Sequence, residues 1–340
     1  MTADDSWPHH RDRTRRLAVV ILNYKTPKLV RDCLATLQGQ LDPARDVAIV
    51  VDNDSGDGSD DVIESEIAEQ GWSDWVRLVR SGVNGGFSAG NNVGIKAERA
   101  DFYLLLNSDT LVRTGTIEEM LRAAEQNQSA GLIGPRLEWP DGEPQNSCFR
   151  DMGVFSELIA GAQSGPITKL FAKHDVTMGV FEDPTRVEWV SFACVLIRRS
   201  VIDRIGLMDE GFFMYFEDAE YCRRARRAGF EVLYWPEAHV VHLRGGSSPV
   251  KSAAAARKRL PAYFYASRSR YFSGAGGRLN LVLVNIAWTL GWLVALGRRV
   301  VQGRRIGTPE RALRDNWTAF WSSHKPKRSR RSTVGRGVQA

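Results

Sequence analysis

The stretch that decides the fold is "FYLLLNSDTLV" at residues 102–112. Its apolar and aromatic residues run without a break into Asn107, Ser108 and Asp109. An unbroken run of this kind is typical of a strand that is covered on both faces of a parallel sheet. The polar residues then lie at the tip of the strand. The single carboxylate there, that of Asp109, is not enough for catalysis by itself. Other segments of the chain must supply the remaining groups of any reactive site.

Earlier in the chain, apolar runs alternate with segments of helical periodicity. The runs are "LAVVIL" (17–22), "VAIVV" (47–51) and "WVRLV" (75–79), and the helical segments are 27–40, 59–70 and 88–99. This alternation predicts an α/β fold with a mostly parallel sheet. Downstream we expect irregular strands and loops over 131–198, helices over 199–206 and 217–229, and strands over 231–235 and 239–243.

Each of the four predicted strands ends in a polar segment. These segments begin with Asn23 and Tyr24, with "DNDSGDGS" (52–59), with "SGVNGGFSAGNN" (81–92) and with "NSDT" (107–110). The carboxyl ends of strands in an open parallel sheet meet in one crevice, so these segments predict a single site. A ring, carboxylates and amides suit a nucleotide diphosphate. The first tip has no glycine, which excludes the G-x-G-x-x-G dinucleotide fingerprint there, and the sequence has no P-loop.

Charge is divided unevenly along the 340 residues. Residues 1–250 carry 27 Lys and Arg against 38 Asp and Glu, whereas residues 251–340 carry 19 against 2. An acidic body with a basic end predicts an anionic partner, either nucleic acid or the phosphates of a membrane. The hydrophobic content of 43% excludes a largely disordered chain. The four cysteines form no C-x-x-C pair and predict buried, reduced thiols.

Five segments occur in an order that resembles a known family. They are "VVILNYKTPKLVRDCLATL", "IVVDNDSGDGS", "NGGFSAGNNVGI", "LLLNSDT" and "GLMDEGFFMYFEDAEYCRRARRAGFEV". The chain resembles the inverting nucleotide-sugar glycosyltransferases with the GT-A fold, above all bacterial rhamnosyltransferases and galactofuranosyltransferases of polysaccharide assembly. The resemblance covers about residues 17–247. It implies a Rossmann-like, mostly parallel sheet with the nucleotide site at the strand carboxyl ends.

The resemblance over 17–247, together with the composition of the two ends, predicts a domain organisation. Residues 1–16 form a polar tail without a secretory signal, and residues 17–247 form the catalytic domain. Within that domain, 17–112 bind the nucleotide, and 113–247 hold the acceptor and the base. A helical, membrane-associating extension follows at 248–307, and a basic tail at 308–340.

On the donor side, the resemblance implies a role for each strand tip. Tyr24 stacks on the nucleobase, Asp52 hydrogen-bonds its edge, and Asn84 and Asn92 lie along the nucleotide. Asp109 matches the last acid of the family's D-x-D motif, which holds Mg²⁺ or Mn²⁺ on the diphosphate. Asn107 stands in place of the first acid of that motif.

On the acceptor side, Asp218 matches the carboxylate that acts as general base. Inversion at an anomeric carbon needs one carboxylate to take the proton of the acceptor hydroxyl, while the nucleotide leaves from the opposite face. The aromatic residues of "FFMYFEDAEY" can exclude water around it. The alternative is that Glu217 and Asp218 merely complement a helix dipole. We assign Trp189, Asp209 and Glu217 to the acceptor site.

A histidine after the base is the second candidate metal ligand. Within the family, a histidine at the position of His242 completes the metal site, and imidazole beside carboxylate and phosphate oxygens suits Mn²⁺ or Mg²⁺. The competing interpretation is a structural histidine, and His239 is the rival on the same strand.

Near the C-terminus, residues 279–297 ("LNLVLVNIAWTLGWLVALG") contain no charge. They are long enough to span a membrane thinly. A single span would carry the basic tail outward, against the positive-inside tendency. We therefore predict a helix or helical hairpin that lies in the inner leaflet or docks on the body. The basic and aromatic residues of 257–272 could receive the diphosphate of a polyprenyl-linked acceptor.

Taken together, the sequence predicts a metal-dependent inverting glycosyltransferase at the cytoplasmic face of a bacterial inner membrane, or in the cytoplasm. Its donor is a dTDP- or UDP-linked sugar, with L-rhamnose from dTDP-rhamnose as the first guess, and its acceptor is a glycan or a polyprenyl-diphosphate-linked sugar. A galactofuranosyl or other hexosyl transferase is the nearest alternative. A nucleic-acid-binding protein or a nucleotide-sugar-binding module without turnover are the alternatives from other classes, and no nucleic-acid partner is expected.

Overall fold

A computed structural model describes residues 14–244, 256, 258–303, 309, 311–318 and 320. Most of the polar tail predicted at 1–16 and of the basic tail predicted at 308–340 lies outside the described residues. So does most of the junction between the predicted catalytic domain and the helical extension.

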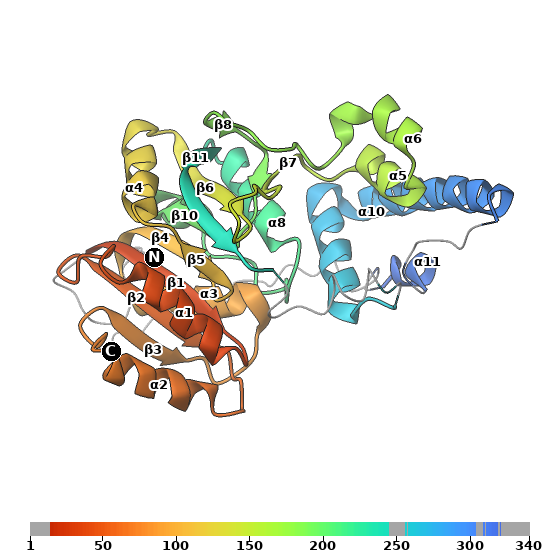
Figure 1. Ribbon diagram of the computed structural model, residues 1–340. Helices are drawn as coiled ribbons and strands as arrows, with labels where there is room; N and C mark the ends of the chain where they lie inside the picture. The colour runs from red at the N-terminus through yellow and green to blue at the C-terminus, as the bar shows by residue number, and fades with distance from the viewer. Residues whose placement is uncertain are drawn as a thin grey trace, which may run out of the picture.

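The first half of the sheet, formed by residues 15–107, is its parallel part (Figure 1). Its strands stand in the order β3-β2-β1-β4, and each pair is parallel. The strands are β1 (Arg15–Asn23), β2 (Asp46–Asp52), β3 (Val76–Arg80) and β4 (Ala100–Asn107). The helices between them are α1 (Pro27–Leu37), α2 (Ser59–Glu69) and α3 (Gly86–Ala97). The βαβ series predicted from the apolar runs is confirmed.

The second half extends the same sheet with strands of both directions. β10 (Cys194–Arg198) lies antiparallel between β4 and β6 (Ala130–Glu138). β11 (Glu231–His242) runs parallel to β6, and β5 (Thr110–Val112) pairs antiparallel with β11. The smaller strands are β7 (Cys148–Phe149), β8 (Thr185–Arg186) and β9 (Trp189–Val190). The separate strands predicted at 231–235 and 239–243 are one strand, β11, whose register shifts between Trp235 and His239.

The helices of the second half are only partly as predicted. α7 (Arg199–Ile205) and α8 (Glu217–Arg227) confirm the two predicted helices, and α4 (Thr116–Gln126) precedes β6. The expectation of only strands and loops over 131–198 is wrong, because α5 (Val154–Ala162), α6 (Gly165–Leu170) and a 3₁₀ turn (Ala172–His174) lie there. α5 is short, and it packs against a helix much later in the chain, so its stability is tertiary in origin.

Hydrophobic side chains fill both faces of the sheet. One cluster includes Val19, Val50 and Leu104, and the other includes Val20, Ile49 and Leu105. Neighbouring residues of one strand thus enter opposite clusters, as expected for strands covered on both faces. The four cysteines are buried and unpaired, as predicted.

The C-terminal part is dominated by the kinked helix α10 (Ala262–Val301), followed by α11 (Ala312–Asp315). The kink lies at Gly276 and Gly277, where Gly277 has φ +73°. The first leg lies beside the catalytic body, and the second extends away from the sheet with α5 alongside it (Figure 1). This contact is close, since a Cβ on Gly291 would lie 2.3 Å from the Leu158 carbonyl oxygen.

Candidate active site

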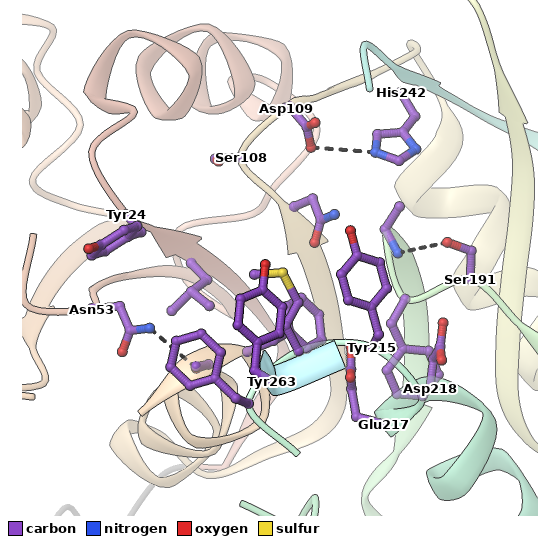
Figure 2. Close-up of a pocket in the computed structure, with 18 of the residues that line it drawn as sticks. Tyr24, Asn53, Ser108, Asp109, Ser191, Tyr215, Glu217, Asp218, His242 and Tyr263 are labelled. Carbon is purple, nitrogen blue, oxygen red and sulfur yellow. Dashed lines mark hydrogen bonds and ion pairs between the residues drawn. The ribbon is translucent and has the colours of Figure 1, made fainter. Parts of the chain in front are cut away.

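A cavity of about 450 Å³ opens at the carboxyl ends of β1, β2 and β4. Side chains from both halves of the sheet and from the start of α8 line it, which is where a ligand is expected in such a fold. Figure 2 shows Asp109 and His242 together on one side, Glu217 and Asp218 on a second, and Tyr24 on a third.

The first pair of candidate functional side chains in the cavity is Asp109 and His242. His242 Nε2 lies 3.5 Å from Asp109 Oδ1, and both side chains are largely buried. Pairing of β5 with β11 brings them together, because His242 stands opposite Thr110 and the Leu243 N–H donates to the Asp109 carbonyl at 2.9 Å. Asp109 lies in the turn directly before β5, and β5 pairs with the strand that carries His242.

His239 does not share this position. Its Nδ1 lies 3.0 Å from Glu138 Oε2, and it does not line the cavity. It precedes His242 by three positions, an odd number, so the two side chains leave the strand on opposite faces. The cavity therefore contains His242 and not its rival.

The second functional group is the carboxyl pair at the start of α8. The Ala219 N–H donates to Asp218 Oδ1 at 2.8 Å, whereas Glu217 Oε2 is buried and has no hydrogen-bond partner among the described residues. Burial raises the pKa of Asp218 to about 6. Burial and then the charge of Asp218 raise the pKa of Glu217 well above its usual range. Asp218 is thus the more readily ionised member and retains a basicity suited to accepting a proton near neutral pH.

On the nucleotide side, the cavity is lined by Tyr24, Asn53, Asn84 and Asn107. Tyr24 is 38% exposed, so its ring is available for stacking. Asn53 Nδ2 donates to Asn84 Oδ1 at 3.0 Å, while its own Oδ1 is buried and has no hydrogen-bond partner in the part of the chain that the structure describes. A buried side-chain oxygen without a partner is unusual in a folded protein and makes Asn53 a candidate for contact with a ligand.

Two predicted nucleotide contacts do not line the cavity. Asp52 is buried and accepts from Asn23 Nδ2 at 2.7 Å and from Ser55 Oγ at 2.6 Å. Asn92 is also buried and bonds the Met208 backbone through both ends of its amide. Both side chains shape the loops around the cavity, and their predicted contacts with the nucleotide stay predictions.

Two predicted acceptor residues also lie away from the cavity. Trp189 stacks on Phe149 with ring centroids 4.1 Å apart, and its Nε1 donates to the Arg150 carbonyl. Asp209 is paired with Arg270. Glu217, the third predicted acceptor residue, does line the cavity.

The family of the chain follows from a sequence match that includes the residues of this cavity up to Tyr263. The profile of the family described as "Glycosyltransferase like family 2" matches residues 14–264, well over half of the chain. The chain belongs to this glycosyltransferase family. The predicted family resemblance is thereby confirmed, and so is an enzyme of the glycosyltransferase class.

Curated relatives of this glycosyltransferase carry related names. It is 29% identical over 262 residues to the N-acetylglucosaminyl-diphospho-decaprenol L-rhamnosyltransferase of Mycobacterium tuberculosis, covering 71% of this chain and 81% of that protein. It is 25% identical to the rhamnosyltransferase WbbL of Escherichia coli, covering 55% and 72%. It is 28% identical to the low-salt glycan biosynthesis hexosyltransferase Agl10 of Haloferax volcanii, covering 64% of this chain but only 63% of that protein.

Solved structures of low sequence identity share the fold. GalNAc-T7, solved with UDP, GalNAc and Mn²⁺, has a TM-score of 0.53 at 14% identity and covers 86% of this chain and 59% of that one. The Pyrobaculum calidifontis mannosyltransferase PcManGT, in complex with GDP-Man and Mn²⁺, has a TM-score of 0.50 at 12% identity and covers 92% and 85%. The predicted GT-A-type α/β fold is thereby confirmed.

The candidate metal-ligating side chains of this glycosyltransferase fit the divalent cation that its family implies. Asp109 and His242 offer a carboxylate and an imidazole, and His242 Nδ1 is buried without a hydrogen-bond partner among the described residues. No cluster of three or more His, Cys, Asp or Glu side chains suited to a metal occurs in the described part of the chain. A cation here would therefore take its other ligands from phosphate and water, as Mg²⁺ commonly does.

Several residues of the site were missed by the sequence reasoning. They are Asn53, Ser191, Met214 and Arg244. Asn53 is the immediate neighbour of the predicted Asp52, so the right strand tip was found but not the right side chain. Tyr263 belongs to the segment 257–272 that was predicted to receive the acceptor, and it lines the cavity from the start of α10. Its contact with an acceptor stays a prediction.

Proposed function

We propose that this protein is a metal-dependent inverting hexosyltransferase that moves a sugar from a nucleotide diphosphate to a membrane-linked or growing glycan. The observation that carries the proposal is the arrangement of the cavity. A carboxylate and an imidazole lie on one side, and a carboxyl group with a raised pKa lies on another. Leaving-group stabilisation and proton abstraction are the two tasks that an inverting transfer requires.

Asp218 is the proposed base. Its ionised carboxylate takes the proton of the acceptor hydroxyl, the hydroxyl oxygen forms a bond to the anomeric carbon, and the bond from that carbon to the diphosphate breaks. Displacement in line from the opposite face inverts the anomeric configuration. Tyr215 and Phe213 come from the same loop and line the cavity beside Asp218, so they exclude water and present apolar faces to sugar rings.

Asp109 and His242 are the proposed ligands of the cation. A bound divalent cation stabilises the negative charge that develops on the leaving diphosphate. Asp109 is held for this task by its backbone bond to Leu243. The exposed ring of Tyr24 can stack on the nucleobase. Asn53 Oδ1, which has no hydrogen-bond partner among the described residues, can accept a hydrogen bond from the nucleobase or the ribose.

The names of the relatives guide the choice of donor and acceptor. Two of them are named rhamnosyltransferases, and one name specifies an N-acetylglucosaminyl-diphospho-decaprenol acceptor. We therefore propose dTDP-rhamnose as the first donor to test and a polyprenyl-diphosphate-linked sugar as the first acceptor.

The second leg of α10 is the proposed membrane contact. Helix α10 is long and apolar enough to cross a bilayer by length and composition, but one of its faces packs on α5. Its opposite face is a stripe of exposed apolar side chains, hereafter the apolar stripe: Leu279, Leu283, Ile286, Leu290, Leu293 and Val294. Such a face is suited to lie in the plane of the membrane interface.

Buried polar contacts favour this orientation over a span. Asn285 is fully buried, accepts from Arg268 Nη1 at 2.6 Å and donates to the Asn316 carbonyl at 3.1 Å. Insertion across the bilayer would break these contacts and leave polar groups in hydrocarbon. Arginines at both ends of the apolar stripe and the basic sequence of 298–340, with 12 Lys and Arg, complement anionic lipid headgroups.

The first test is an assay of donor use. The purified full-length protein is incubated with a panel of nucleotide sugars, and release of the nucleoside diphosphate is followed with and without Mn²⁺ or Mg²⁺. We expect one donor, first of all dTDP-rhamnose, to be turned over only when the cation is present. Turnover that is unaffected by chelation would contradict the role of Asp109 and His242, and absence of turnover with every donor and acceptor would contradict the proposed function.

A further inference from the structure

The loop that precedes the base, residues 206–216, is held in place by the first leg of α10. Arg270 donates from Nε to Asp209 Oδ2 at 2.6 Å and from Nη2 to Asp209 Oδ1 at 2.8 Å. Ser267 Oγ donates to the Met214 carbonyl at 3.1 Å. Two-point pairing of a guanidinium with a carboxylate fixes direction as well as distance.

Aromatic contacts reinforce this attachment at the end of the loop. Phe216, which directly precedes the Glu217–Asp218 pair, lies 5.5 Å from Phe264 and 5.7 Å from Tyr271 between ring centroids. Phe213 lies 5.2 Å from Tyr263 in the same measure. The base-bearing helix therefore begins on a surface that α10 provides.

The backbone of the loop requires such support. Tyr215 and Phe216 both have positive φ, at +72° and +70°. Bulky residues in this region are strained and persist only where surrounding contacts hold them. These two strained residues stand immediately before the carboxyl pair, so a small relaxation of the loop would move Asp218.

The opposite side of the loop is fixed by α3. The Phe87 N–H donates to the Phe213 carbonyl at 2.6 Å, and Asn92 clamps Met208. A Cβ on Gly86 would lie 2.1 Å from the Phe213 carbonyl oxygen, which leaves room for glycine alone. The loop thus lies between the donor-binding half and α10, and the Arg270–Asp209 pair is its charged attachment on the α10 side.

We infer that Arg270 is a positioning residue for the base and that the first leg of α10 is part of the catalytic unit. Through Asp209, Arg270 holds the loop so that Asp218 faces the acceptor hydroxyl. This gives Asp209 a role different from the acceptor contact predicted from the sequence. The inference rests on the proposed function, since it assigns a role in the same proposed transfer.

The test compares variants of Arg270 in the full-length protein. We expect Arg270→Gln to lower kcat by about 10²-fold, because a displacement of about 1 Å at a reacting group costs that much. The nucleotide site is formed by other elements, so the affinity for the nucleoside diphosphate and the KM for the donor should stay near those of the wild type. Arg270→Lys keeps the positive charge but cannot form the two-point pairing with Asp209. Its kcat should lie between that of the wild type and that of Arg270→Gln.

A charge swap and a matched control separate positioning from general destabilisation. The double variant Asp209→Arg/Arg270→Asp should recover part of the kcat lost in Arg270→Gln. Arg16→Gln removes another paired arginine, which bonds both carboxylate oxygens of the buried Asp46 at the opposite ends of the strands. It should lower the melting temperature while leaving kcat near that of the wild type.

The outcomes are distinct. Arg270→Gln with wild-type kcat would overturn the inference, as would a loss of kcat matched by an equal loss of nucleotide affinity. If Arg270→Gln and Arg16→Gln lowered kcat in proportion to melting temperature, the role would be structural and the inference wrong. Absence of transfer by the wild-type protein would overturn the proposed function, and with it this assignment, before any variant is compared.

Discussion

At the scale of single residues, the site is made of side chains that are far apart in the sequence. Asp109 follows β4, His242 ends β11 and Asp218 begins the intervening α8. Motif resemblance selected all three, and the structure places them around one cavity. Periodicity alone could not have done so, because the β5–β11 pairing that brings His242 to Asp109 is a long-range contact.

The residue-level errors have a common physical cause. A strand tip identifies a neighbourhood, but the turn that follows decides which side chain faces outward. The Asp52 side chain accepts hydrogen bonds from Asn23 and Ser55 in the adjoining loops, and Asn53 lines the cavity instead. Turn conformation depends on such local hydrogen bonds, which composition does not specify.

The raised pKa of Asp218 predicts the pH dependence of the reaction. A base with a pKa of about 6 is protonated below that pH and cannot accept a proton. We expect kcat/KM to fall about tenfold per pH unit on the acid side of this value and to level off above it.

Glu217→Gln is the control for this pH profile. Burial and then the charge of Asp218 raise the pKa of Glu217 well above that of an ordinary carboxyl, and the Gln variant removes this second titrating group while keeping its size. The acid limb should therefore remain in the Glu217→Gln variant. A profile that is flat in the wild type from about pH 5 to about pH 8 would show that Asp218 is not the titrating base.

At the scale of elements, the strands and helices of the parallel part of the sheet were predictable, whereas helices α5 and α6 were not. β1 to β4 and α1 to α3 carry their periodicity in the sequence because each is buried or amphipathic in a regular layer. α5 exists because it packs on α10, more than a hundred residues later. Its short sequence offers no local signal that could replace this contact.

Helix α10 joins two tasks in one element. Its first leg supports the loop 206–216 that precedes the proposed base, and beyond the kink at Gly276 and Gly277 its second leg bears the apolar stripe. The sequence shows that part of this helix has no charge, but it does not show which face packs on the protein and which face is exposed. Only the packing of one face against α5 shows which side chains remain exposed.

The apolar stripe predicts how membrane binding can be weakened. Replacing Leu283 and Leu290 with Asp should reduce binding to vesicles of anionic phospholipid by at least about 100-fold, because each leucine loses about 1.5–3 kcal/mol of burial. Val62→Asp is the control, since Val62 on α2 is 48% exposed, like Leu283 at 45% and Leu290 at 53%. Co-sedimentation of the full-length protein measures binding, and an unchanged bound fraction for the double variant would exclude the apolar stripe as the membrane contact.

At the scale of the whole molecule, the proposed donor half and the proposed acceptor half share one continuous sheet. β10 runs antiparallel between β4 of the first half and β6 of the second, so the two halves form one scaffold. The cavity lies where the loops of both halves and the start of α10 converge. The order of the sequence motifs predicted this general plan, while the participation of α10 required the tertiary structure.

The central claim is that Asp218 performs chemistry in a site whose nucleotide-binding parts are separate from it. The most direct measurement compares sugar transfer and nucleoside diphosphate affinity in the wild type and in Asp218→Asn. Removing the base should lower kcat by at least about 10²-fold while the nucleotide dissociation constant stays within about threefold of the wild type. An Asp218→Asn protein that retains most of its transfer rate, or one that loses nucleotide binding as fully as activity, would contradict the account.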